Sequence, residues 1–178
     1  MPQTFLSTYT FGDMVVRFPQ DMASGRVGLE IIPASALNQA VSRRESLRGL
    51  PFIDAMPGND PWPACVVESL VQFKLVGEQY PGAFAQGHTL RQSGSVAQFK
   101  AVGQNVLKEQ HRFVIVTKLI RADGCSVEHR LAHLEGDRAF EITSAFTNGS
   151  AKPVTLEMLS SFSLGWTLAP NVNCTSNE

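Results

Sequence analysis

The stretch that decides the fold runs from Phe113 to Leu164 and contains four apolar segments: Phe113-Val-Ile-Val-Thr-Lys-Leu-Ile120, Ser126-Val-Glu-His-Arg-Leu-Ala-His-Leu134, Ala139-Phe-Glu-Ile-Thr-Ser-Ala-Phe-Thr147 and Val154-Thr-Leu-Glu-Met-Leu-Ser-Ser-Phe-Ser-Leu164. Short glycine-containing turn sequences separate them, about every 13 residues. Within each segment the apolar residues alternate with a period of two, which is typical of β-strands. Because no helical pattern intervenes, the stretch predicts an antiparallel meander in an all-β, antiparallel β-sandwich.

The inward faces of these strands can be predicted from the alternation. The segment Phe113–Ile120 is apolar on both faces, so we expect a central strand that is covered on both sides. In the third segment Phe140, Ile142 and Phe146 share a face. In the last segment the expected inward residues are Val154, Leu156, Met158, Phe162 and Leu164.

The first half of the chain predicts further strands and one helix. A hairpin of Phe5–Phe11 and Met14–Phe18 is expected through Gly12-Asp13. The helix is expected over Ser35–Arg48, with Ser35 as its N-cap. The remaining predicted strands cover Val27–Ile31, Cys65–Leu75 (with Glu68, Gln72 and Lys74 pointing away from the core), Val96–Val102 and Asn105–Lys108.

Composition limits the classes of function. The chain has 178 residues, 43% of them apolar, and a net charge of −1, which provides no electrostatic footprint for nucleic acid. The N-terminus lacks a signal-peptide pattern and no segment approaches the ~20 apolar residues of a membrane span, so a cytoplasmic location is expected. The three cysteines share no ligand spacing, and Cys65 and Cys125 are interpreted as small buried side chains. No metal site or cofactor is expected.

Side chains that could contact a carbohydrate gather in two loop-like segments. One contains Trp62 beside Asp54 and Asp60, in which a ring could stack on a sugar while carboxylates accept hydrogen bonds from its hydroxyls. The other combines aromatic, amide, imidazole and guanidinium groups in Tyr80, Phe84, Gln86, His88 and Arg91. The alternative is that both segments only pack on their own sandwich, with the aspartates capping turns.

His129 and His133 lie four residues apart in a predicted strand. They share a face there but stand roughly 13 Å apart at ~3.3 Å per residue, which is too far to chelate one metal ion. Glu128, Glu135 and Asp137 flank a hairpin turn, where solvated charge is expected. A structural role is therefore predicted for these groups, and no catalytic residue is assigned.

The amino-acid sequence of the meander resembles that of one protein family. The segments Glu128-His-Arg-Leu131, Leu134-Glu-Gly-Asp-Arg-Ala-Phe-Glu141 and Pro153-Val-Thr-Leu-Glu-Met-Leu-Ser-Ser-Phe-Ser-Leu-Gly165 are similar to the N-terminal β-sandwich of α-galactosidase-like enzymes of glycoside hydrolase family 36. Upstream, Arg43–Gly49, Ser69–Lys74 and Tyr80–Arg91 extend the resemblance, which covers roughly residues 43–165.

The resemblance implies a supersandwich of the galactose-mutarotase-like kind beside a catalytic (β/α)8 barrel that holds two aspartates. Neither aspartate has a counterpart here, so the implied role is non-catalytic: docking on the barrel, supporting oligomer contacts and shaping the substrate entrance. Residues 1–165 are expected to form the sandwich. Because the periodicity fades from Trp166 onward, residues 166–178 are expected to be an irregular tail. That the sandwich is incomplete at its C-terminus remains an alternative. An unpaired edge would then favour a homo-oligomer.

Two other functions remain alternatives. A stand-alone carbohydrate-binding module would bind galactosides through Trp62 or the Tyr80–Arg91 loop. A mutarotase-like sugar epimerase would need a histidine and a glutamate as an acid–base pair, with His88 or His129 and Glu128 or Glu135 as the candidates.

Overall fold

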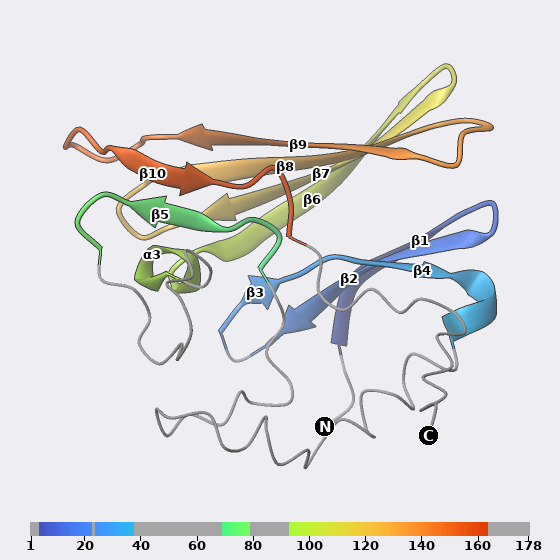
Figure 1. Ribbon diagram of the computed structural model, residues 1–178, viewed down its shortest axis with the longest axis horizontal. Helices are drawn as coiled ribbons and strands as arrows, with labels where there is room; N and C mark the ends of the chain where they lie inside the picture. Colours follow the sequence, from blue (N-terminus) through green and yellow to red (C-terminus); the bar gives the residue numbers. More distant parts are fainter. Residues whose placement is uncertain (1–3, 23, 38–68, 79–92, 164–178) are drawn as a thin grey trace, which may run out of the picture.

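The computed structural model describes residues 4–22, 24–37, 69–78 and 93–163. In this part of the chain nearly all regular structure is antiparallel β-strand, which confirms the all-β prediction. The strands form two layers that face one another (Figure 1). The predicted tail at 166–178 and the predicted helix beyond residue 37 lie outside the described residues.

One layer is a four-stranded sheet in the order β6-β7-β8-β9, here called the meander sheet. Its strands are β6 (Lys100–Glu109), β7 (Arg112–Ile120), β8 (Ser126–Leu134) and β9 (Phe140–Thr147). Strands β7, β8 and β9 lie where the alternation predicts them, within one residue at each end. Their hairpins place Phe140, Ile142 and Phe146 against the core, also as predicted. The fourth predicted segment, Val154–Leu164, does not join this sheet: within its described part only Leu156–Leu159 form a strand, and that strand lies in the other layer.

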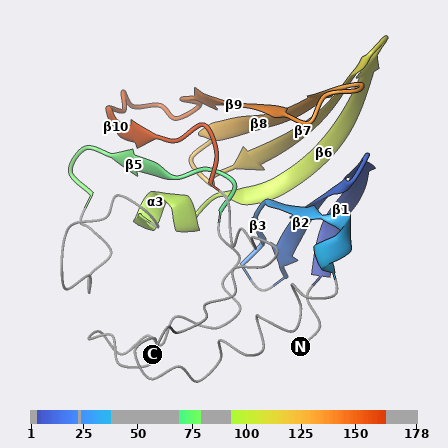
Figure 2. The same cartoon turned by 45° about the vertical axis from the view of Figure 1, so that its right-hand side comes forward.

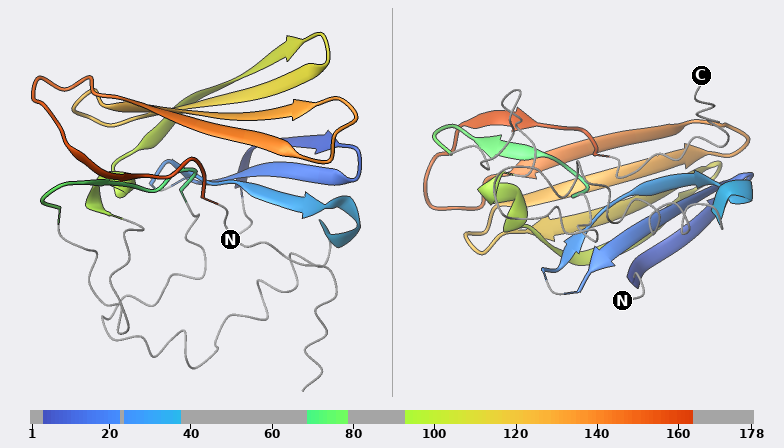
Figure 3. Two further views of the ribbon diagram at one scale, coloured as in Figure 1. Left: turned by 45° about the horizontal axis from the view of Figure 1, so that its top comes forward. Right: turned by 60° about the horizontal axis from the view of Figure 1, so that its bottom comes forward.

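The other layer contains two smaller sheets (Figure 3). The N-terminal sheet consists of β1 (Thr4–Phe11), β2 (Met14–Asp21), β3 (Arg26–Val27) and β4 (Glu30–Pro33), with β3 and β4 both on the same side of β2. The β5–β10 ribbon pairs β5 (Phe73–Leu75) with β10 (Leu156–Leu159). Backbone hydrogen bonds from Leu70 N to Val27 O (3.1 Å) and from Ser163 N to Leu70 O (2.7 Å) connect the two sheets.

The core lies between the layers. Rings from the N-terminal sheet meet rings of the meander sheet, with Phe11 and Phe113 centroids 5.2 Å apart and Phe11 and Phe140 centroids 5.6 Å apart. At the opposite end Phe73 of the ribbon stacks on Phe146 at 4.9 Å. Such contacts add stabilisation of about 1 kcal/mol each to the burial of apolar area.

Local interactions explain the hairpin of β1 and β2 and the short helix α3. Gly12 takes a positive φ of 58° in the turn between β1 and β2, which confirms the predicted hairpin. Residues Gly94–Ala97 form α3, which Ser93 caps by accepting a hydrogen bond from Val96 N at 3.2 Å. The predicted strand Val96–Val102 is therefore wrong over residues 96–99, because a serine cap starts a helical turn there.

Several other expectations need correction. Strand β6 begins at Lys100, so it includes the last three residues of the strand predicted over Val96–Val102 and continues through the strand predicted over Asn105–Lys108. Within the described part of the predicted helix, Ala34–Ala36 form one 3₁₀ turn after Pro33, and Ser35 does not cap it. The predicted strand Val27–Ile31 is divided into β3 and β4. In the described part of the strand predicted over Cys65–Leu75, only β5 is regular.

Side-chain directions also differ from the alternation in three places. Gln72 and Lys74 are buried rather than pointing to solvent, because β10 and the segment after it cover them. In β10 a register shift between Leu156 and Met158 turns Leu159 to the core and leaves Leu156 exposed, and Phe162 beyond it is exposed as well. Strand β7 is not covered on both sides, since Lys118 and Ile120 on its outer face are exposed.

Candidate functional site

The side chains predicted to contact a carbohydrate all lie outside the described residues, and their role stays a prediction. They are Trp62, Tyr80, Phe84, Gln86, His88 and Arg91, and the same holds for Asp54, Asp60 and Cys65. The buried position predicted for Cys125 is confirmed. Among the described residues, no group of three or more potential metal ligands comes together.

The most unusual feature of the described part is a row of polar side chains across the inner face of the meander sheet. Gln104 on β6 pairs with Thr117 on β7, Thr117 pairs with His129 on β8, and His129 pairs with Ser144 on β9. Each of these polar residues occupies an inward position, where an apolar side chain is normally found. Because they are paired in register, the four form one line perpendicular to the strands. We call these residues the polar row.

The two ends of the polar row are hydrogen-bonded. The amide oxygen of Gln104 accepts hydrogen bonds from the hydroxyls of Ser7 at 2.5 Å and Tyr9 at 3.2 Å, both on β1 of the opposite layer. Its amide nitrogen donates to Thr117 Oγ1 at 2.8 Å. At the other end Ser144 Oγ donates to the backbone oxygen of Ser161 at 2.5 Å. The row therefore connects the two layers at both edges.

His129 in the middle of the row has no such support. Its side chain is fully buried, and neither ring nitrogen has a hydrogen-bond partner among the described residues. Burial lowers the pKa of His129 from 6.5 to about 4, because the imidazolium would lose its hydration, and a contact of the ring with its own backbone offsets only part of this loss. The imidazole is thus neutral at neutral pH, and with no exposed surface it cannot reach a substrate from solvent.

The described histidines and glutamates do not form the acid–base pair that a sugar epimerase requires. Glu128 neighbours His129 along β8 and so points to the opposite face, where Arg130 Nε donates to it at 2.7 Å. Glu135 at the hairpin turn lies 3.2 Å from Nδ1 of His111, and both side chains are about three-quarters exposed. His133 shares the inner face with His129, as predicted, and packs on Phe11 with centroids 4.6 Å apart.

A second polar cluster surrounds Arg121 at the turn between β7 and β8. Its guanidinium donates to Asp123 Oδ1 at 2.9 Å and to Ser95 Oγ at 2.8 Å, so it fastens the turn to α3. The hydrogen bond to Asp123 raises the pKa of Arg121, and the same interaction holds the pKa of Asp123 well below its usual range. Both groups are consequently locked in their charged forms, which suits a structural clamp.

The same turn packs against the turn that follows β9 through two glycines. Gly124 has a φ of 90°, and a Cβ added to it would lie 2.8 Å from the backbone oxygen of Gly149. A Cβ on Gly149 would overlap the backbone oxygen of Gly124. Only glycine therefore allows the two backbones to approach so closely.

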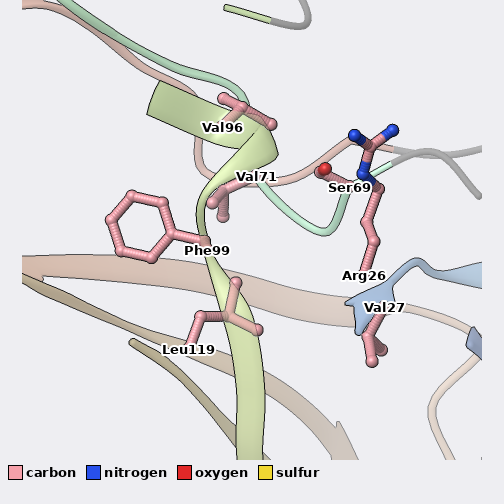
Figure 4. Close-up of a pocket in the computed structure, with 7 residues that line it drawn as sticks. All are labelled: Arg26, Val27, Ser69, Val71, Val96, Phe99 and Leu119. Carbon is pink, nitrogen blue, oxygen red and sulfur yellow. The ribbon is translucent and has the colours of Figure 1, made fainter. Parts of the chain in front are cut away.

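Two small hollows are found in the described part of the molecule. One is a cavity of about 10 Å³ between the layers, lined mainly by apolar side chains of β3, α3 and β7 together with Val71 and Phe99, with Arg26 and Ser69 on one side (Figure 4). The other is a hollow of about 60 Å³ on the outer face of the meander sheet, over Val114 and Ala132. Sites for small organic ligands usually span hundreds of Å³, so neither hollow encloses a sugar ring.

An ion pair bridges the outer hollow. Arg112 Nη2 lies 2.7 Å from Glu141 Oε2, and this pair crosses β8 between β7 and β9. Both side chains are substantially exposed, which limits such a pair to less than about 1 kcal/mol. Arg112 and Glu141 on the outer face of the meander sheet thus form a pair of opposite charges.

The sequence interpretation missed the polar row, although a signal for it exists. In β7 and β9 one polar residue interrupts the inward apolar positions, namely Thr117 and Ser144, and in β8 the inward polar residues are His129 and His133. If the three predicted strands are placed in the register that their turns require, Thr117, His129 and Ser144 fall opposite one another.

Comparison of the chain with protein-family models, with curated proteins and with solved structures finds no match. No helix in the described part is both long enough and apolar enough to cross a membrane.

Proposed function

We propose that this chain is a non-catalytic β-sandwich domain of an α-galactosidase-like glycoside hydrolase, with a structural role beside a catalytic barrel. The observation that carries the proposal is that the stretch resembling this family builds three of the four strands of the meander sheet, and five of its acidic groups lie in separate ion pairs.

The resembling stretch forms a continuous part of the structure. Residues 113–147 build three neighbouring strands of the meander sheet, and residues 156–159 add β10 to the opposite layer. The quoted family segments therefore include strand ends and turns as well as strand interiors. Because the residues that resemble the family form strand pairs and turns, they support a scaffold role for the domain.

Five carboxylates of this stretch each form an ion pair with a basic side chain. A glycosidase places two carboxyl groups about 5 to 10 Å apart across the bond that is cleaved. Here each acidic partner has a basic neighbour of its own. These pairs are Asp123–Arg121, Glu128–Arg130, Glu135–His111, Glu141–Arg112 and Glu157–Lys74.

The interior offers no alternative centre. The polar row is enclosed between the layers, and its most basic group, His129, is buried and neutral. General acid–base chemistry needs a group that exchanges protons near the working pH and touches the substrate. His129 meets neither condition, which supports a structural role.

The proposal is tested with two measurements on the purified chain. With an aryl α-galactoside as substrate, we expect no release of the aryl group above a protein-free blank. With a family 36 catalytic barrel prepared without its own sandwich, we expect co-elution in size-exclusion chromatography and a higher unfolding temperature of the barrel. Turnover of the galactoside by the chain alone would refute the non-catalytic role, and absence of any association would refute the docking role.

Titration with galactosides separates this proposal from the carbohydrate-binding alternative. We expect a flat response at millimolar sugar. Saturable binding that Trp62→Ala abolishes, while the circular dichroism spectrum stays unchanged, would replace the proposal with a stand-alone binding module. Tyr80→Ala provides a matched test of the second loop.

A further inference from the structure

Strand β6 forms one edge of the meander sheet, and no described strand pairs with its outer side. Among the described residues, β7 is the only strand that pairs with β6. Near the start of β6, the backbone nitrogen of Ala101 also donates a hydrogen bond to Gly25 O at 3.3 Å. Figure 2 shows the far end of the β6–β7 hairpin projecting beyond β1 of the layer below. Alternate residues of such an edge present unpaired N–H and C=O groups.

Three apolar side chains of this edge are substantially exposed, beside the charged Lys108 and Glu109 near its end. Val102, Val106 and Leu107 are 56%, 37% and 44% exposed, and all three lie on β6. Natural edge strands are normally kept short or are protected by charges, because an exposed apolar edge pairs readily with another strand. Strand β6 spans ten residues, so a partner strand is the expected cover.

The uninterrupted part of the β6 edge has an odd number of residues, so a single residue lies at its centre. A register shift between Ala101 and Gly103 interrupts the pairing of β6, and the strand ends at Glu109. The uninterrupted segment therefore runs over residues 103–109, with Val106 at its centre. A two-fold axis through Val106 pairs this segment with itself in an antiparallel ladder without any overhang.

The side chains brought together by this register are compatible. Val106 meets its own copy, and Lys108 lies opposite Gln104 rather than another lysine. Asn105 lies opposite Leu107, and Glu109 lies opposite Gly103. No like charges face each other, whereas a two-fold centred on residue 108 would place lysine against lysine.

We propose that two copies of this chain associate through β6, with residues 103–109 of each copy paired antiparallel about Val106. The two meander sheets then form one continuous eight-stranded sheet. This inference goes beyond the proposed function and does not rest on it, because it uses only the edge of β6. Association with a barrel could fail while this pairing holds, and the reverse also applies.

The first test measures mass in solution. Light scattering on the full chain at about 100 μM is expected to give twice the 19.4 kDa of one chain. Val106→Lys places two ammonium groups face to face and is expected to weaken the dimer by about 100-fold. Val102→Lys, at a more exposed position outside the paired segment, is the matched control and should leave the dimer intact. Thermal unfolding shows whether each variant is folded.

The second test fixes the register by disulfide formation. In a background with Cys65→Ser and Cys174→Ser, Val106→Cys is expected to cross-link under mild oxidation, because facing strand residues have Cα atoms about 5 Å apart. Val102→Cys should not cross-link, since its two copies would stand roughly 26 Å apart at ~3.3 Å per residue. A monomer for the wild-type chain, or a dimer that Val106→Lys and Val102→Lys affect equally, would overturn the proposal.

Discussion

Replacing His129 by leucine is the most informative perturbation of the interior. The imidazole is fully buried in the polar row and neither nitrogen has a partner in the described part of the chain. Leucine has a similar volume and no polar atoms, so His129→Leu removes the unpaired groups without opening a large cavity. We expect the stability at neutral pH to be equal or higher, and its dependence on pH to become weaker.

The size of the effect follows from the pKa of His129, which burial lowers from 6.5 to about 4. Between these values the unfolded chain binds a proton that the folded chain excludes, so stability falls as the pH decreases. Above pH 6.5 the imidazole is neutral in both states and has no effect on pH dependence. At 1.36 kcal/mol for each pKa unit, the full loss is about 3 kcal/mol, and most of it is reached by pH 4.5.

Urea unfolding at pH 7.5 and at pH 4.5 measures this loss directly. The wild-type chain should lose about 2 to 3 kcal/mol more between these pH values than His129→Leu. His111→Gln is the control, because His111 is about three-quarters exposed and its replacement should leave the wild-type profile in place. Parallel profiles for wild type and His129→Leu would refute the reasoning, since they would mean that His129 finds hydration or a partner when protonated.

Two further predictions concern packing and buried charge. Gly149→Ala should lower the free energy of unfolding by about 2 kcal/mol, because the new Cβ overlaps the backbone of Gly124, while Gly94→Ala, with open space around it, should have little effect. Glu30→Gln should cost about 3 kcal/mol, because Glu30 is 2% exposed and forms an ion pair at 2.9 Å with an arginine of β2. Glu141→Gln, in an exposed ion pair, should cost less than about 1 kcal/mol; equal losses for the two glutamates would contradict the burial argument.

The meander was predictable from sequence because two independent signals agree there. The period of two fixes which residues face inward, and short turns at 122–124 and 136–137 fix the register between neighbouring strands. Strands β7, β8 and β9 consequently lie where the pattern places them. The hairpin of β1 and β2 was predictable for the same reason.

The errors occur where tertiary contacts decide the local structure. Lys74 was expected at the surface, but the distant strand β10 covers it and Glu157 neutralises its charge. The register shift before Met158 depends on pairing with β5, about eighty residues away in the chain, and a local alternation contains no information about it. The cap at Ser93 was visible in the sequence, yet the valines that follow favoured a strand.

The candidate site was only partly predictable. The structural role expected for His129 and His133 agrees with their inner positions, whereas the hydrogen-bonded Gln104 and Ser144 were not singled out. A polar residue at an inward strand position stands out only when neighbouring strands are compared in register. The aromatic contact residues around Trp62 and Tyr80 stay predictions.

The long stretch of chain between the N-terminal sheet and the meander sheet has a consequence for synthesis on the ribosome. Strands β1 to β4 end at Pro33, but the rings that cover them, such as Phe113 and Phe140, emerge roughly a hundred residues later. At about 10 residues per second, the N-terminal sheet waits on the order of ten seconds with its apolar face uncovered. During that interval chaperones can bind the nascent N-terminal sheet. The two layers can pack together only after the meander strands have been synthesised.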